Sequence, residues 1–158
     1  MLTLILSIAC SAGSGCDYNE YKVAEFYNKN YASSMCAALA NTLMLARSPQ
    51  DKERDALFRC LDNDDPKNAG RQLYISDAPQ TVMFIETCPF DERSGRFKKQ
   101  GSAECEAQDI ATFYGDHASA MCQNRLNNTQ PLYAAQYDIR AFNGHLNCVA
   151  MDAEADAL

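Results

Sequence analysis

The sequence predicts an all-α fold, a single-domain bundle of four or five helices cross-linked by about three disulfides. Apolar residues recur at spacings of three and four along several segments, which is the pattern of one helical face. Six widely spaced cysteines follow residue 35, and Gly- and Pro-containing stretches separate the periodic segments. A chain of 158 residues that is 47% hydrophobic can bury the core of one such domain.

Five segments carry the helical pattern: residues 19–47, 48–62, about 80–88, 102–126 and 131–149. Pro49 and Pro131 suit the first position of the second and last helices. The stretch 72–88 is also rich in β-branched and aromatic residues, so a strand remains an alternative there. We find no repeat or linker that would divide the chain, and we expect one helical domain over residues 16–158.

The wide cysteine spacing favours disulfides over zinc. The six candidate disulfide cysteines are Cys36, Cys60, Cys88, Cys105, Cys122 and Cys148. No two of them lie closer than 17 positions, whereas structural zinc sites usually take two ligands from one tight turn. Disulfides indicate an oxidising compartment. Two antiparallel helices that meet near Ser48 predict a Cys36–Cys60 pair. Comparing how far two cysteines lie from the turn between their helices also predicts a Cys105–Cys148 pair. The Cys88–Cys122 pair then remains by elimination.

The N-terminus resembles a secretory signal. An apolar stretch from Leu2 to Ala9 is followed by small residues through Gly15, so residues 1–15 are expected to be a signal peptide or a lipoprotein signal. No Lys or Arg precedes the apolar stretch, and the alternative is a buried N-terminal strand or helix. We expect a protein that is secreted or held in the periplasm or cell envelope.

Whether an odd or an even number of cysteines remains after cleavage bears on the cleavage position. Cleavage after Ala12 leaves seven cysteines, and lipidation of Cys10 leaves seven others. Lipidation of Cys16 leaves six, which can form three bridges. Cys16 is therefore the lipidation candidate. Without a lipid, Cys16 could join two chains in a covalent dimer.

The charge of the chain limits its partners. A net charge of −7 and a pI near 4.7 disfavour binding to nucleic acid and to anionic lipid surfaces. After residue 9 no apolar run approaches the roughly 20 residues of a spanning helix, so membrane contact would need the lipid anchor. An acidic surface suits a basic protein partner.

Three surface features are candidate sites. The loop that follows Cys88 carries the one basic patch: Arg93, Arg96, Lys98 and Lys99. Tyr18 and Tyr21 are candidates for a tyrosine-lined contact surface. Asn127 begins an Asn-Asn-Thr glycosylation sequon in an expected turn at residues 127–131.

The sequence favours a non-enzymatic protein over an enzyme. It has no nucleophile elbow, no HExxH motif and no phosphate-binding glycine loop, and we expect no catalytic residue, cofactor or metal. We expect a protein that acts by binding another protein, as an inhibitor, immunity protein or effector does. Two alternatives remain. A carrier would hold an apolar ligand in a cavity lined by Met35, Phe84, Ile139 and Phe142. A hydrolase would need His117 or His145 to converge on a carboxylate.

Overall fold

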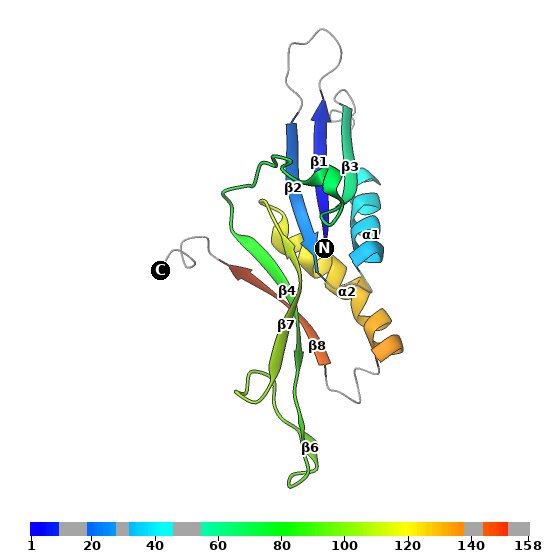
Figure 1. The fold of residues 1–158 in the computed structure, drawn as a ribbon. Helices are drawn as coiled ribbons and strands as arrows, with labels where there is room; N and C mark the ends of the chain where they lie inside the picture. Colours follow the sequence, from blue (N-terminus) through cyan, green and yellow to red (C-terminus); the bar gives the residue numbers. More distant parts are fainter. Residues whose placement is uncertain (10–18, 28–31, 46–54, 138–143, 152–158) are drawn as a thin grey trace.

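The all-α expectation is wrong. A computed structural model describes residues 1–9, 19–27, 32–45, 55–137 and 144–151, and it shows a six-stranded antiparallel sheet with two helices packed on one face (Figure 1). In chain order the elements are β1 (Leu2–Ala9), β2 (Asn19–Phe26), α1 (Ala32–Leu45), β3 (Asp55–Asp62), the short 3-10 helix η2 (Pro66–Asn68), β4 (Gln80–Thr87), β5 (Phe90–Asp91), β6 (Arg96–Phe97), β7 (Glu106–Phe113), α2 (Ala118–Tyr137) and β8 (Gly144–Met151).

The sheet consists of two halves with the same topology. The strand order is β3-β1-β2-β7-β4-β8, so β1-β2-α1-β3 and β4-β7-α2-β8 are two ββαβ units joined through β2 and β7. Two matching hydrogen bonds flank the junction. The N–H of Tyr27 donates to the carbonyl of Ile110 at 2.8 Å, and that of Tyr114 donates to the carbonyl of Val23 at 2.9 Å. These contacts relate the halves by an approximate two-fold axis.

The sequence also repeats where β2 and β7 lead into the helices, which corrects the expectation of no repeat. Residues 24–36 read AEFYNKNYASSMC and residues 111–122 read ATFYGDHASAMC, with seven identities and a difference of one residue in length. The shared Ala, Met and Cys of each helix pack toward the sheet, with Cys36 and Cys122 both 0% exposed. A small first-turn Ala lets each helix approach the strands closely.

The apolar N-terminal stretch is a central strand. β1 pairs with β2 on one side and β3 on the other. Leu4 packs among the core residues beneath the helices, and Ile5, on the opposite face, is also fully buried. η2 and the chain around it lie over that second face (Figure 1), where Thr3 donates to Asn63 at 2.9 Å. A strand buried on both faces has a nearly continuous apolar sequence, as a signal peptide does. Cys10, Ala12 and Cys16 lie outside the described residues.

The other expected helices are also wrong, in type or in extent. The expected helix 19–47 is β2 followed by α1, and the expected helix 102–126 is β7 followed by the first half of α2. Residues 55–62 and 144–151 are strands rather than helices, and β4 is the strand alternative of stretch 72–88. The expected turn at 127–131 is absent because α2 continues to Tyr137, so Asn127 lies exposed on a helix. No helix in the described part of the chain is long and apolar enough to cross a membrane.

The described residues contain three disulfides. Cys36–Cys60 joins α1 to β3 and Cys122–Cys148 joins α2 to β8, so they occupy equivalent positions in the two halves. The third bond, Cys88–Cys105, links the end of β4 to the start of β7. Cys36–Cys60 is the expected pair, but the expected Cys105–Cys148 and Cys88–Cys122 pairs are wrong. Both pairs were predicted by comparing heights along antiparallel helices, whereas Cys148 lies on strand β8 and Cys88 and Cys105 lie at the ends of β4 and β7.

The repeat predicts the state of the two remaining cysteines. Cys10 and Cys16 follow β1 and precede β2 in the sequence, as Cys88 and Cys105 follow β4 and precede β7. We expect all eight cysteines to be paired. Alkylation of the unreduced protein should therefore add no mass, and alkylation after reduction should add eight labels. One or more labels without reduction, or fewer than eight after reduction, would contradict the pairing, and six labels after reduction would restore Cys16 as the lipidation candidate.

Candidate functional site

The basic loop forms a hairpin that projects from the sheet between β4 and β7 (Figure 1). We call residues 89–104 the arm. Strands β5 and β6 pair Phe90 with Phe97 and Asp91 with Arg96. Gly95 makes the turn with a φ of 68°, and its N–H donates to the Asp91 carbonyl at 2.9 Å. The N–H of Arg93 donates to Asp91 Oδ1 at 3.0 Å and lowers the pKa of that carboxyl. These bonds hold a two-stranded hairpin outside the main sheet.

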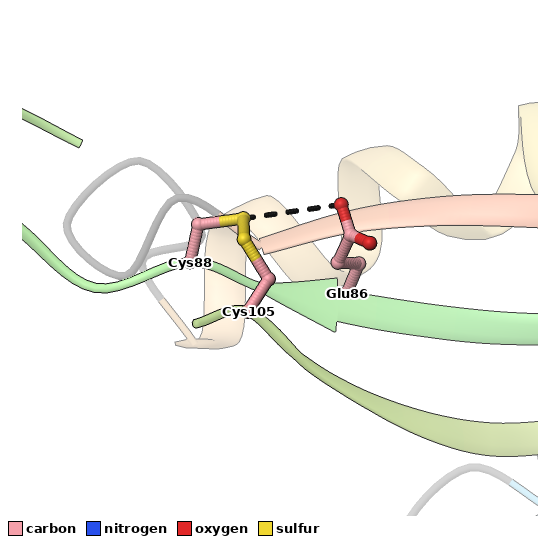
Figure 2. Close-up of side chains that lie close together, drawn as sticks. All are labelled: Glu86, Cys88 and Cys105. Carbon is pink, nitrogen blue, oxygen red and sulfur yellow. Dashed lines mark hydrogen bonds between the residues drawn. A yellow bond between two sulfur atoms is a disulfide. The ribbon is translucent and has the colours of Figure 1, made fainter. Parts of the chain in front are cut away.

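The base of the arm is fixed by a disulfide and by polar contacts (Figure 2). Cys88 and Cys105 lie with their Cα atoms 4.2 Å apart, and Cys88 is 1% exposed. Glu86 lies beside the bond and accepts the Gly101 N–H at 3.0 Å. The Ser102 hydroxyl donates to Cys105 Sγ at 3.1 Å. The arm therefore leaves the sheet from an anchored base.

The same base contains a cluster with metal-ligand chemistry. The ligand atoms of Glu86, Cys88 and Cys105 all lie within 4.8 Å of one another. In the structure the two sulfur atoms are bonded to each other (Figure 2), so neither is a thiolate that could bind zinc. The cluster supports the arm and does not form a metal site in this disulfide state.

The four predicted cations of the arm are not equivalent. Lys98 is half-buried and pairs with Glu104 at 3.3 Å and with Asp91 at 3.6 Å; its hydrogen bond to Glu104 raises its pKa. Arg93, Arg96 and Lys99 are exposed, and within the described part of the chain they form no ion pair. The arm has four basic and three acidic residues and a net charge of +1, which leaves −8 for the rest of the chain.

An aromatic pair accompanies these charges. Phe90 is 53% exposed and meets Phe97 edge to face, with ring centroids 5.2 Å apart. Exposed aromatic and arginine side chains are enriched in protein contact surfaces. The pattern of the sequence located the basic residues, but it did not indicate that Phe90 lies exposed beside them.

The predicted tyrosine surface lies elsewhere. Tyr21 is 38% exposed and its ring lies 5.6 Å from that of Tyr74, which is 60% exposed; Tyr18 lies outside the described residues. The backbone of Tyr74 pairs with β2 on both sides of Tyr21, and Ile75 beside it is 53% exposed. The start of β2 and the arm lie toward opposite ends of the molecule (Figure 1), so the two predicted regions are separate surfaces.

A buried polar cluster lies at the junction of the two halves. Glu25 is 8% exposed and accepts the hydroxyls of Tyr27 at 3.3 Å and Tyr114 at 3.0 Å, while Lys22 forms an ion pair with it. Burial raises the pKa of both tyrosines, and the Glu25 carboxylate raises that of Tyr114 further. The groups satisfy one another, which is the arrangement of a structural cluster.

This cluster predicts a loss of stability at high pH. A tyrosine of the unfolded chain ionises near pH 10. Tyr27 and Tyr114 keep their protons to higher pH when folded, so the unfolded state binds fewer protons above pH 10 and the free energy of unfolding falls there. Tyr114→Phe should flatten this fall while costing about 1 to 2 kcal/mol at pH 7, where it removes a hydrogen bond to a carboxylate. Urea unfolding between pH 7 and 11 measures both effects. The exposed Tyr74→Phe is the control, and an equal slope for wild type and Tyr114→Phe would contradict the assignment.

The structure places the residues of the two alternative functions on several different elements. His117 is exposed just before α2, and His145 is half-buried on β8, opposite Glu86 in the pairing with β4. Met35 lies in the core beneath the helices, whereas Phe84 lies between Met83 and Ile85, which face that core, and so points to the other face of the sheet. Ile139 and Phe142 lie outside the described residues.

No known protein family, curated protein or solved structure matches this chain. The fold and site define a disulfide-linked α+β protein built from two ββαβ units, with an anchored arm inserted in the second unit. Three intramolecular disulfides are compatible with an extracellular location.

Proposed function

We propose that this is a non-enzymatic protein, secreted or held in the cell envelope, that binds another protein through the arm. One observation carries the proposal. A hairpin anchored by Cys88–Cys105 presents three exposed cations and an exposed phenylalanine at one end of a protein whose remaining charge is −8. Because the base is cross-linked, binding would cost little ordering of the backbone, which favours affinity.

The charges also indicate the chemistry of the partner. Arg93 and Arg96 can each form paired hydrogen bonds with a carboxylate, so the arm fits an acidic patch on the partner surface. The acidic remainder of the chain attracts a partner that is basic overall and speeds the encounter. We therefore propose that the partner is a basic protein with a local group of carboxylates on its surface.

Affinity capture from the medium or envelope fraction of the source organism tests the proposal. The wild-type chain should retain a partner whose dissociation constant rises at least tenfold for Arg96→Glu, the loss expected when about 1.4 kcal/mol of contact is removed. Lys67→Glu makes the same charge change at an exposed position in η2 and should bind as the wild type does. A partner that binds Arg96→Glu and Arg93→Glu as tightly as wild type, or the retention of no partner at all, would overturn the proposal.

A further inference from the structure

The outer edge of β8 is open among the residues that the structure describes. β8 is the last strand of the sheet, and on its inner side it pairs with β4 over all eight residues. An edge strand presents backbone N–H and C=O groups that can pair with another chain. On β8 the Asn147 side chain donates to the His145 carbonyl at 3.3 Å, a contact that strand pairing at this position would replace. β8 reads GHLNCVAM, which contains no Lys, Arg, Asp, Glu or Pro. It therefore lacks the residues that usually block such pairing.

The equivalent strand of the first half differs in this respect. β3 ends the other side of the sheet and reads DALFRCLD, with Asp55, Arg59 and Asp62 along its length. Charges on an edge strand disfavour pairing with another strand. The two strands occupy the same place in the repeated topology, so the difference is one of side chains and not of architecture.

We infer that β8 pairs with β8 of a second copy of this chain, antiparallel and about a two-fold axis, to join the two six-stranded sheets. Two observations favour a second copy over another protein. A strand without a formal charge places no like charges opposite each other when it pairs with itself. The chain already joins its own halves in this way, since β2 and β7 are equivalent strands that pair antiparallel.

The side chains on the face of β8 that points away from the helices fit such a contact. Val149 is 41% exposed, and His145 and Asn147 lie on the same face of the strand. Antiparallel pairing of two β8 strands about an axis near Asn147 brings the Val149 of one copy beside His145 or Asn147 of the partner subunit. The exposed valine would then gain a cross-strand neighbour, which stabilises a paired sheet. This interface uses the outer edge of β8, whereas the arm projects from the connection between β4 and β7.

Sedimentation velocity over a concentration series tests the inference. Wild-type protein should sediment with twice the chain mass of 17.5 kDa at high concentration. Val149→Lys should raise the dimer dissociation constant at least tenfold. Leu57→Lys is the matched control, because Leu57 is 49% exposed on β3, at the other edge of the sheet, and this variant should dimerise as wild type does.

Hydrogen exchange measured by mass spectrometry provides a second readout that needs no variant. Raising the protein concentration should slow exchange in the peptide that covers β8 and leave the peptide that covers β3 unchanged. A wild-type chain that stays monomeric up to a few hundred micromolar would overturn the inference. So would a dimer that Val149→Lys leaves intact, or one that Leu57→Lys weakens equally.

Discussion

A chain that begins at Cys16 is expected not to form the sheet. Such a chain lacks β1, which lies between β2 and β3 and is the one described neighbour of β3. It also lacks Leu4 and Ile5, both fully buried. The loss of two such side chains and two strand pairings exceeds the roughly 5 to 15 kcal/mol by which a domain of this size is stable. Far-ultraviolet circular dichroism and thermal unfolding of the truncated chain should show no cooperative transition.

Point variants separate the role of β1 from a general effect of shortening the chain. Leu4→Ala should lower the free energy of unfolding by about 2 to 5 kcal/mol, because it opens a cavity in the core. Leu57→Ala, at an exposed position on β3, should change it by less than about 1 kcal/mol. A folded protein that begins at Cys16 when isolated from its host would contradict this account. It would support the signal peptide that the sequence pattern predicts.

The second large effect on stability is expected when either of the two helix-to-strand disulfides is removed. The bonds Cys36–Cys60 and Cys122–Cys148 close similar loops, with sequence separations of 24 and 26. Replacing both cysteines of either bond by Ala should therefore lower stability by similar amounts, about 3 kcal/mol each, since the gain in unfolded-state entropy depends on loop length. Urea unfolding of the two double variants measures this.

The Cys88→Ala/Cys105→Ala variant is the matched comparison. Its bond closes the arm, which projects from the sheet, so the folded arm also gains freedom when the bond is absent and the net loss of stability should be smaller. In this variant the free energy of partner binding should decrease by more than the free energy of unfolding does, because the arm is no longer preorganised. A larger stability loss here than at Cys122–Cys148 would contradict this description of the arm.

The sequence predicted the disulfide chemistry but not the sheet. Wide spacing without a CxxC motif correctly favoured disulfides, and α1 lies within a segment expected to be helical. The strands were missed because several of them have apolar residues at consecutive positions. In β4, Met83 faces the helices while Val82 and Phe84 face the other side, so the alternation of polar and apolar residues that marks a half-exposed strand is absent.

The repeat was the signal that could have predicted the topology. The shared Ala-x-Phe-Tyr before each helix and Ala-Ser-x-Met-Cys within it mark two copies of a strand followed by a helix. The candidate site was predicted in part. The sequence located four cations in a surface loop, but only the folded hairpin shows that Lys98 is paired with Glu104 and Asp91. The position of Tyr74 beside Tyr21 depends on a long-range pairing that no local pattern encodes.

Disulfide mapping tests the duplicated architecture most directly. Proteolysis of the unreduced protein followed by mass spectrometry should yield peptides that link Cys36 to Cys60, Cys88 to Cys105 and Cys122 to Cys148. The first and third bonds occupy the same place in the two halves, so the map reports on the repeat as well as on each contact. Peptides that link Cys105 to Cys148 or Cys88 to Cys122 would contradict the two ββαβ units and would favour the helical bundle that the apolar periodicity predicts.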